Sequence, residues 1–439
     1  MHRVAIIGSG ISGLSAAWHL SQSEQPTHVT LFEAGRHFGG HANTVDVTLD
    51  GITHGVDTGF LVFNERTYPG LIDLFQRLGV ETAPSEMSFS VQAPRAEGQA
   101  PLEWSGHSLN TVFAQRSNLI KPRFWSMLAD IVRFNQLTTA LAQKGADAAL
   151  AQPIGDFLEA HGFGIAFRED YFLPMVACIW SCPTQQMLRF PMATMIRFCH
   201  NHGLLQIANR PQWYTVKGGS KQYVHRIVRS LSDARLNTPV RSITRQPQGV
   251  TVHTDAGHEV FDEVVLACHS DQALALLGPQ ATPTERLILS SIRYQSNRAV
   301  LHTDTNMLPS RRSAWAAWNY ERSAAPETQQ NPVCLHYLIN QLQPLPWAQP
   351  VIVSLNPIRD IAPRTVIQEI EYAHPVFDQA AIEAQQALPR MQGLQHTWFA
   401  GAWCGYGFHE DGYQAGLQVA RQLQAQWAAR ADAVGRQAA

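Results

Sequence analysis

The first residues of the chain pass from an apolar stretch through a glycine cluster into a helical pattern. Residues 4–8 form a short apolar run, and the turn Gly-Ser-Gly-Ile-Ser-Gly follows it. Ile11, Leu14 and Trp18 then recur at helical spacing, and residues 29–32 form a second apolar run. The order strand, tight turn, helix and strand predicts a compact βαβ unit whose parallel strands are buried.

Further along, helical and strand-like patterns alternate in long blocks. Residues 76–205 show helical patterns that are broken by prolines and dense in tryptophan and phenylalanine. Strand-like runs return near Val240, recur within residues 291–385, and end with residues 398–401 before a closing helix. We therefore expect an α/β fold with two interleaved domains. The first, Rossmann-like domain takes residues 1–75, 206–290 and 386–439, and the second, α+β domain takes residues 76–205 and 291–385.

Composition and charge narrow the possible partners. The chain has 439 residues, and its 33 Lys and Arg nearly balance 35 Asp and Glu, so no global field attracts nucleic acid. Small molecules are the expected partners. The six cysteines contain no C-x-x-C pair, which is typical of reduced thiols and favours a cytoplasmic location. Because neither a signal peptide nor a long apolar run is evident, we expect no membrane span, and peripheral membrane contact stays open.

The glycine turn is the first segment whose residues indicate a binding site. Gly8, Gly10 and Gly13 match G-x-G-x-x-G, and Ser9 and Ser12 lie between them. The first glycine makes the turn, the second lets a pyrophosphate approach the backbone, and the third lets the helix pack closely on the strand. The phosphates then meet the positive end of the helix dipole. We expect these five residues to bind a dinucleotide.

An acidic residue follows at the expected distance. Glu33 ends the second strand, 20 residues beyond Gly13 (33 − 13 = 20). A carboxylate there can accept hydrogen bonds from the adenosine ribose hydroxyls, and it disfavours the 2′-phosphate of NADP. A solvated glutamate at the end of a strand is the alternative interpretation.

The segment after Glu33 resembles a family signature. Residues 33–41 are similar to the E-x5-G-G-R pattern of the flavin amine oxidase superfamily, which includes amine oxidases, protoporphyrinogen oxidase and carotenoid desaturases. The resemblance implies that Gly39 and Gly40 pass close to the phosphates of FAD. This chain has His41 where the pattern has arginine, and Arg36 could supply the missing charge.

Other landmarks of the superfamily occur in order along nearly the whole chain. The resemblance places Gly59 beside the isoalloxazine ring and Val240 at the adenine, and it makes residues 399–401 and Gly412 part of the C-terminal closure over FAD. Gly401 is therefore another expected contact. The G-x3-G spacing at Gly412 is tighter than the usual G-x4-G. Residues 56–60, 179–181 and 407–412 also resemble a bacterial subgroup that is often encoded beside methyltransferases resembling cyclopropane fatty acid synthase.

Amine oxidases of this superfamily commonly place a lysine, linked through water to the flavin, early in the second half of the substrate domain. The matching stretch here lies near residues 297–300, and no lysine occurs from residue 291 to 385. This absence favours the desaturase-like members, which manage without that lysine, over amine oxidation.

The segment before the closing helix is expected to lie near the flavin ring. Glu410 and Asp411 could bind the ribityl hydroxyls, and His409 is a candidate general base. The alternative is that the two acids cap the helix and that His409 packs in the core. Cys404 follows the F-A-G landmark, whereas the cysteine that binds flavin covalently in some amine oxidases precedes it, so we expect non-covalent FAD.

Aromatic side chains in the second domain are candidates for an apolar substrate pocket, although plain core packing is the alternative. They are Trp180, Phe190, Trp315, Trp318 and Tyr337. Cys178 and Cys182 have no companion cysteine pair or suitably spaced histidines, so we expect no metal.

These features together predict an FAD-dependent oxidoreductase of oxidase or desaturase type. Its expected substrate is apolar, such as a fatty acyl chain, and its electron acceptor is left open. An amine oxidase, a redox-neutral flavin-dependent isomerase or mutase, and a non-catalytic flavin-binding protein are the alternatives.

Overall fold

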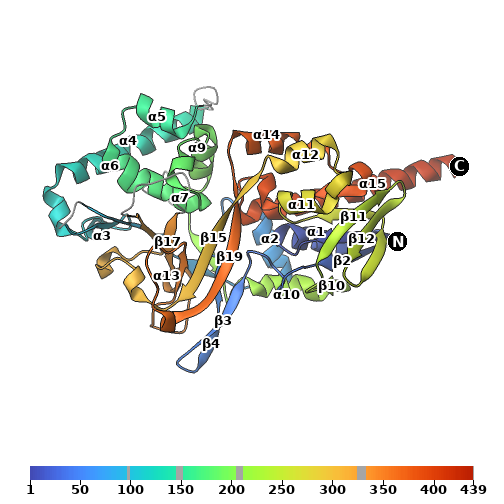
Figure 1. Cartoon of the computed structure of the whole chain (residues 1–439), viewed down its shortest axis with the longest axis horizontal. Coiled ribbons are helices and arrows are strands. Elements are labelled where there is room, and N and C mark those ends of the chain that lie inside the picture. Colours follow the sequence, from blue (N-terminus) through green and yellow to red (C-terminus); the bar gives the residue numbers. More distant parts are fainter. Residues whose placement is uncertain (96–98, 145–151, 204–210, 324–332, 439) are drawn as a thin grey trace.

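Two long antiparallel strands join the two halves of the protein (Figure 1). The computed structural model describes residues 1–95, 99–144, 152–203, 211–323 and 333–438. In Figure 1, strands β15 and β19 run between a half that contains α1, α10, α11 and α15 and a half that contains α4, α5, α6, α7 and α9. The functional site lies where these halves meet.

A five-stranded parallel sheet forms the centre of the first half. Its order is β10-β2-β1-β14-β20, and each neighbouring pair is parallel. Both faces of the central strands are covered, so residues 4–7 read as a continuous apolar run. The predicted βαβ unit is confirmed. Its elements and the other strands are β1 (His2–Ile7), α1 (Ile11–Ser21), β2 (Thr27–Phe32), β10 (Asp233–Arg235), β14 (Glu263–Leu266) and β20 (Thr397–Phe399).

Smaller elements surround this sheet. The strand-like runs predicted near Val240 form an antiparallel three-stranded sheet in the order β11-β12-β13, and a glycine pair at residues 218 and 219 precedes α10. The bounds are β3 (Thr44–Leu49), β4 (Ile52–Asp57), α2 (Pro69–Leu78), α10 (Lys221–Ser230), β11 (Val240–Gln246), β12 (Gly249–Thr254), β13 (Gly257–Phe261), α11 (Ser270–Leu277), α12 (Pro283–Ser290) and α15 (His409–Ala438).

A seven-stranded mixed sheet forms the base of the second half. Its order is β19-β15-β18-β17-β16-β7-β8. The strand-like runs predicted within residues 291–385 are confirmed, because β15 to β19 lie there. The bounds are β7 (Phe89–Ala93), β8 (Leu102–Ser105), β15 (Arg293–His302), β16 (Trp318–Glu321), β17 (Cys334–Leu338), β18 (Ile352–Leu355) and β19 (Val366–Val376).

The prediction that residues 76–205 are helical is wrong for the first part of this range. Strands β6 (Thr82–Ser85), β7 and β8 occupy this stretch, and only the residues after them are helical. β6 pairs with β9 (Trp213–Val216), which also pairs with β5 (Phe63–Asn64). β7 and β8 are short and largely buried, so they lack the alternation that marks a half-exposed strand.

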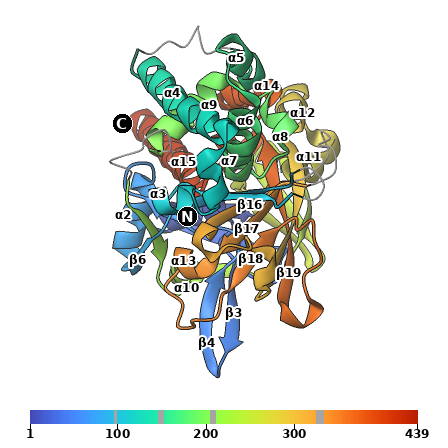
Figure 2. The ribbon, with the colours of Figure 1, turned by 90° about the vertical axis from the view of Figure 1, so that its left-hand side faces the viewer.

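Helices cover one side of the seven-stranded sheet, and the hairpin of β3 and β4 projects from the opposite end (Figure 2). The helices are α3 (Leu109–Val112), α4 (Pro122–Lys144), α5 (Ile154–Ala160), α6 (Ile165–Phe167), α7 (Leu173–Trp180), α8 (Thr184–Met187) and α9 (Met192–Asn201), and α13 (Ile339–Leu342) and α14 (Gln379–Ala387) lie elsewhere. No helix in the described part of the chain is both long and apolar enough to cross a bilayer. The strands of the two sheets fall in the ranges predicted for the two domains, whose exact boundaries stay a prediction.

A buried carboxylate connects three segments at the junction of the halves. Asp57, at the end of β4, accepts hydrogen bonds from the Thr44 hydroxyl, the Ser220 amide and hydroxyl, and the Gln343 amide. Burial raises the pKa of Asp57 to about 6, although these hydrogen bonds act in the opposite direction. The segment that carries Gly59 is thereby fixed against α10 and the second half.

Helix α15 crosses α1 at backbone-to-backbone distance. A Cβ at Gly416 would lie 2.1 Å from the Ser12 carbonyl oxygen, and a Cβ at Gly412 would lie 2.7 Å from Ile11 Cγ2. The tight G-x3-G spacing is therefore a packing feature, because it puts both glycines on the face that meets α1.

We predict that Gly416→Ala destabilises the protein. In an exposed helix this change would stabilise by roughly 0.5–1 kcal/mol, but here the new methyl group would clash with α1, and overpacking costs roughly 1–3 kcal/mol. Urea unfolding of the purified protein measures the difference. Gln418→Ala, at an exposed position of the same helix, is the control and should be nearly neutral. A G416A protein as stable as the parent would contradict the close crossing.

Candidate functional site

The glycine turn between β1 and α1 has three glycines with three different surroundings. Gly8 has φ +102°, and a Cβ there would lie 2.8 Å from the Ala267 carbonyl oxygen. A Cβ at Gly13 would lie 1.9 Å from the Gly8 carbonyl oxygen, so Gly13 lets α1 contact the turn. At Gly10 a Cβ would meet no atom within 4 Å. Gly10 therefore leaves space for a ligand, as a pyrophosphate requires.

Glu33 organises the turn from the end of β2. Its carboxylate accepts hydrogen bonds from the Ser9 amide at 3.0 Å and the Ser9 hydroxyl at 2.5 Å, and from the Gly35 amide at 2.7 Å. Glu33 also lines the main cavity. The carboxylate thus lies beside the glycine turn, as a ribose acceptor must.

The second glycine pair lies directly on the first turn. The Gly39 amide donates to the Ser9 carbonyl and hydroxyl, and a Cβ at Gly40 would lie 3.2 Å from the Cα of Gly10. Both glycines have positive φ, +118° at Gly39 and +59° at Gly40. The two glycine motifs therefore form one cradle, which fits the phosphates of FAD because its open space borders Gly10 and Gly40 and no side chain fills it.

Histidine replaces the family arginine beside this cradle. The His41 ring stacks on Tyr372 at 4.8 Å and lies 5.2 Å from His374, measured between ring centroids. Burial, together with the nearby histidines, holds the pKa of His41 well below its ordinary value. Arg36 is exposed and does not line the cavity. Neither His41 nor Arg36 therefore supplies the charge of the family arginine, and backbone N–H groups and the α1 dipole would attract the phosphates instead.

One cavity of about 720 Å³ runs from the cradle into the second half. At the cradle end it is lined by Gly8, Ser9, Gly10, Ser12, Glu33, Gly40, His41, Gly59 and Val240, all of which the sequence predicts as cofactor contacts. Gly401 lines it as well. Gly13 and Gly39 lie behind this surface and shape the cradle through backbone packing.

The far end of the cavity is aromatic. Three of the five predicted pocket residues, Trp180, Trp318 and Tyr337, line it. The other two do not, and this corrects the sequence interpretation. Phe190 packs behind Trp180 at 4.9 Å, and Trp315 lies on a separate cluster with Leu308, its indole N–H donating to the Pro309 carbonyl.

The predicted ribityl contacts, Glu410 and Asp411, have other partners and do not line the cavity. Glu410 accepts hydrogen bonds from the Gly70 and Leu71 amides and so caps the start of α2. Asp411 accepts from the Phe408 amide at the start of its own helix, and burial raises its pKa to about 6. Gly412 contacts α1 instead of the cavity. Their contact with FAD stays a prediction that the contacts in the structure do not favour.

His409 lines the cavity but is tightly packed. Its ring stacks on Phe60 at 3.8 Å, and its Nε2 lies 2.8 Å from the Tyr223 hydroxyl. Burial lowers the pKa of His409 to about 3, so the imidazole is neutral and a weak base. A proton-transfer role for His409 stays a prediction.

Three histidines outside the predicted site residues also line the cavity, namely His202, His269 and His374. His202 donates from Nδ1 to the Phe198 carbonyl, which leaves Nε2 as an acceptor. His374 has the opposite tautomer. The Asn297 amide donates to His374 Nδ1, so the His374 proton is on Nε2. Burial lowers the pKa of His202 and His374 to about 4.

The orientation of the Asn297 amide is fixed by its other contacts. The Asn356 amide donates to Asn297 Oδ1 at 2.7 Å, and Asn297 Nδ2 also donates to the Gln295 carbonyl at 3.0 Å. Asn297 lies on β15, where the resemblance puts the lysine of amine oxidases. At this place the chain holds a neutral imidazole N–H from the neighbouring strand β19.

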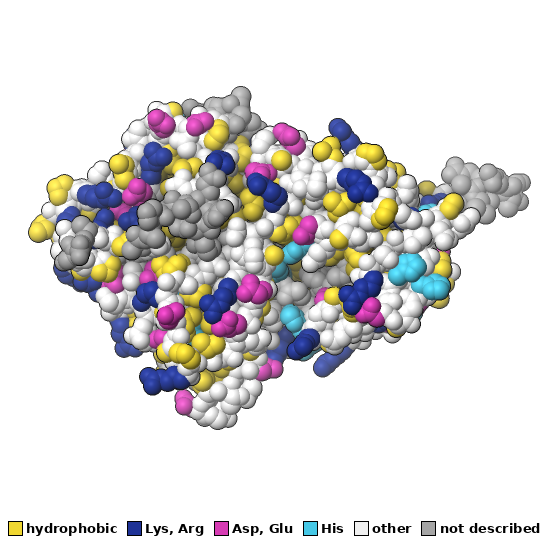
Figure 3. All heavy atoms as spheres, viewed as in Figure 1, with side chains coloured by type: hydrophobic (Ala, Val, Ile, Leu, Met, Phe, Trp, Pro, Cys, Tyr) yellow, Lys and Arg dark blue, Asp and Glu magenta, His cyan; other side chains and the backbone are white. Residues whose placement is uncertain are grey.

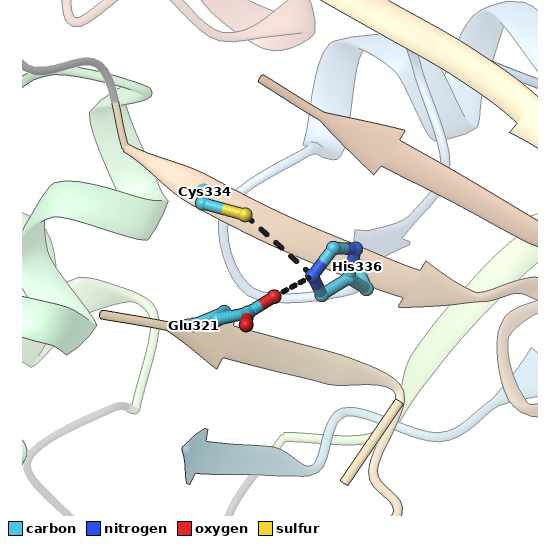
Figure 4. Close-up of side chains that lie close together, drawn as sticks. All are labelled: Glu321, Cys334 and His336. Carbon is cyan, nitrogen blue, oxygen red and sulfur yellow. Dashed lines mark hydrogen bonds and ion pairs between the residues drawn. The ribbon is translucent and has the colours of Figure 1, made fainter. Parts of the chain in front are cut away.

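Glu321, Cys334 and His336 form a second cluster, on β16 and β17 (Figure 4). A metal ion would need a lone pair on His336 Nε2. That nitrogen lies 3.0 Å from Glu321 Oε2, and the Arg359 guanidinium also pairs with Glu321. Hydrogen bonds from His336 and Arg359 outweigh burial and lower the pKa of Glu321. A cation beside this arginine would be repelled.

The positions of the protons in this cluster follow from one backbone hydrogen bond, which the Asp304 amide donates to a histidine. The Asp304 amide donates to His302 Nδ1, so the His302 proton is on Nε2 and is donated to the Ser354 hydroxyl. Ser354 in turn donates to His336 Nδ1 at 2.6 Å, and His336 Nε2–H donates to Glu321. We interpret the cluster as a closed hydrogen-bond network rather than a metal site.

The comparisons with known proteins agree with this geometry. The family described as flavin containing amine oxidoreductase matches residues 11–346. Among curated proteins, none matches this sequence. Solved structures share the fold across nearly the whole chain.

Three solved structures illustrate this likeness. A variant of putrescine oxidase is 17% identical with a TM-score of 0.67, covering 97% of this chain and 99% of that one. A fatty acid isomerase from P. acnes that produces CLA is 17% identical with a TM-score of 0.65, covering 96% and 98%. Cyclohexylamine oxidase from Brevibacterium oxydans IH-35A is 17% identical with a TM-score of 0.65, covering 97% and 99%.

We predict that Gly10→Ala leaves the fold intact but removes FAD. Its Cβ meets no protein atom and instead projects into the space for the pyrophosphate. The purified variant should be colourless and should unfold at the same urea concentration as the FAD-free parent protein. Gly13→Ala is the contrasting variant, because its Cβ overlaps the Gly8 carbonyl and should destabilise the protein itself. Full FAD occupancy in G10A would falsify the cradle.

We also predict that His302 makes stability depend on pH. Burial, with a smaller contribution from His336, lowers the pKa of His302 from 6.5 to about 4. The unfolded chain then binds a proton below pH 6.5 and the folded protein does not, so stability falls as pH decreases from about 6.5 to about 4. Between pH 7 and pH 5 this single group accounts for about 2 kcal/mol.

Urea unfolding at the two pH values tests this prediction. His302→Asn should reduce the loss of stability on acidification by about 2 kcal/mol, whereas His107→Asn, at an exposed position, should leave it unchanged. Equal pH dependence in the parent and in H302N would contradict the assigned neutral tautomer.

Proposed function

This chain belongs to the family of flavin-containing amine oxidoreductases, and we propose that it oxidises an apolar substrate with FAD, a fatty acyl chain being the class that fits best. The strongest support is the scarcity of charged side chains in the cavity lining. Glu33 and Arg241 are the only Asp, Glu, Lys or Arg among its described lining residues, and both lie at the cradle end. The aromatic end therefore offers no carboxylate to a substrate ammonium group.

The residues at the aromatic end suit a hydrocarbon. Trp180, Phe198, Trp213, Trp318 and Phe408 present ring faces and edges, and Met87 adds a flexible apolar side chain. Transfer of hydrocarbon from water to such a surface gains about 25 cal/mol per Å². A diamine would instead lose the hydration of its charges without a partner.

Bound FAD would take up the electrons that leave the substrate. The protein's part is to hold the substrate and exclude water. His374 presents a neutral N–H donor and His202 a neutral acceptor to the cavity, so hydrogen bonds can form there without net charge. We also propose non-covalent FAD, because Cys404 does not line the cavity.

A redox-neutral isomerase is the second candidate. An apolar cavity of the same kind suits an acyl chain whose double bonds are moved without net oxidation. The similar fold of a fatty acid isomerase is compatible with this reaction, although 17% identity relates the two proteins by fold alone.

We predict that unsaturated fatty acids, and not amines, react with the bound flavin. Mixed anaerobically with oleate, the holoprotein should lose the visible absorption of oxidised flavin, whereas putrescine and cyclohexylamine should leave it unchanged. Turnover that begins only after chemical reduction of the flavin would support the isomerase. Bleaching by amines alone would contradict the proposal.

A matched pair of tryptophan variants links the reaction to the cavity. Trp318→Ala should lower the rate of bleaching at limiting substrate by about tenfold or more, because Trp318 lines the cavity. Trp315→Ala, three residues away and outside the cavity, should keep the rate of the parent protein once its stability is checked.

A further inference from the structure

Exposed apolar side chains gather on the segment that leads into α4. Ile120 is 85% exposed, Leu109 is 80% exposed, Trp125 is 50% exposed and Leu119 is 47% exposed. All four lie within residues 109–125, on α3, on the short 3-10 helix Arg116–Ile120 and on the first turn of α4. Soluble surfaces rarely concentrate large apolar residues in this way unless they meet a partner. We call residues 109–125 the apolar ledge.

A hydrogen bond and aromatic packing hold the apolar ledge in place. The Trp125 indole N–H donates to the Leu119 carbonyl at 2.9 Å, and the Trp125 ring lies 5.4 Å from the buried Phe113 ring. Phe113 contacts Phe124, which packs against Trp104. The segment that carries the exposed side chains is therefore ordered by aromatic packing and does not need to fold on binding.

Positive charge accompanies these side chains. No Asp or Glu occurs between Glu103 and Asp130, whereas Arg116, Lys121 and Arg123 are exposed there. Arg123 pairs with Asp170, whereas the described partners of Arg116 are the Phe113 carbonyl and the Asn110 side chain. In the part of the chain that the structure describes, Arg116 and Lys121 have no carboxylate partner. Figure 3 shows hydrophobic and basic side chains next to one another at the end of the molecule that carries α3 and the start of α4.

We propose that the apolar ledge docks on the surface of an anionic phospholipid bilayer. Insertion of Ile120, Leu119 and Leu109 into the acyl boundary, with Trp125 at the headgroup level and Arg116 and Lys121 on lipid phosphates, matches the pattern of interfacial binding segments. A second copy of this chain is a poor occupant, because a twofold contact would bring the same unpaired cations together. The surface goes beyond the proposed function and does not depend on it.

Co-sedimentation of the holoprotein with lipid vesicles tests the proposal. We expect the protein to bind vesicles of phosphatidylglycerol and phosphatidylcholine in equal parts, to bind phosphatidylcholine alone much more weakly, and to dissociate as salt is added. Ile120→Ser should lower the partition coefficient by about tenfold, because it removes apolar surface from the lipid boundary. Lys121→Glu should lower binding to the anionic vesicles and leave the weak binding to phosphatidylcholine unchanged.

A matched control comes from another exposed leucine. Leu287 on α12 is 70% exposed but lies outside the ledge, so Leu287→Ser should bind vesicles like the parent protein. Failure of the parent to bind anionic vesicles, or an equal loss in L287S and I120S, would overturn the proposal. Sedimentation velocity without lipid provides the second readout: a dimer that I120S dissociates would assign the ledge to a second copy and overturn lipid docking.

Discussion

The site depends on backbone segments that approach each other where no side chain intervenes. Gly13 lets α1 contact the turn at Gly8, Gly40 rests on Gly10, and Gly416 lets α15 contact α1 at Ser12. A Cβ atom in place of the glycine hydrogen at Gly13 or Gly416 would force these segments apart. Because the start of α1 is held from both sides, its free N–H groups keep a fixed direction toward the cavity.

This arrangement explains how an anionic cofactor can be held with so little positive charge. At the cradle end the ionisable side chains include Glu33, which is acidic, Arg241, which is paired with Asp255, and His41, which burial keeps neutral. Phosphates must therefore be stabilised by oriented dipoles, whose strength depends on geometry. The hydrogen bonds from Ser9 to Glu33 and from Gly39 to Ser9 are consequently as important as any charged group, since they hold the two glycine motifs in register.

The local parts of the site were predictable from the sequence, and the distant ones were not. Strand, turn, helix and Glu33 lie within one βαβ unit, whose geometry follows from short-range rules. Trp318 and Trp315 could not be told apart without the strand register. Trp318 pairs with Tyr337 across β16 and β17, which puts both on the cavity face, while the neighbouring His336 lies on the other face. His374 and His202 reach the cavity from segments whose positions only the fold determines.

Glu410 shows a second limit of sequence reasoning. An acid at the start of a helix fits a ligand contact and a cap equally well, and only the position of α2 decided that Glu410 binds the Gly70 and Leu71 amides. The strands β7 and β8 were missed because both faces of each strand are covered, so the alternation of polar and apolar residues is lost.

The two hydrogen-bond networks of the seven-stranded sheet share one property that bears on chemistry. In each, a backbone or amide contact fixes the proton on one nitrogen: Asn297 fixes it on His374, and the Asp304 amide fixes it on His302. A buried imidazole fixed in this way resists protonation, because protonation would break the hydrogen bond that orients it. On the cavity side this gives a neutral donor near β15, where the resemblance to amine oxidases would place a lysine. A neutral wall costs a hydrocarbon little and offers an ammonium group no compensating charge, which supports the proposed preference for an uncharged substrate.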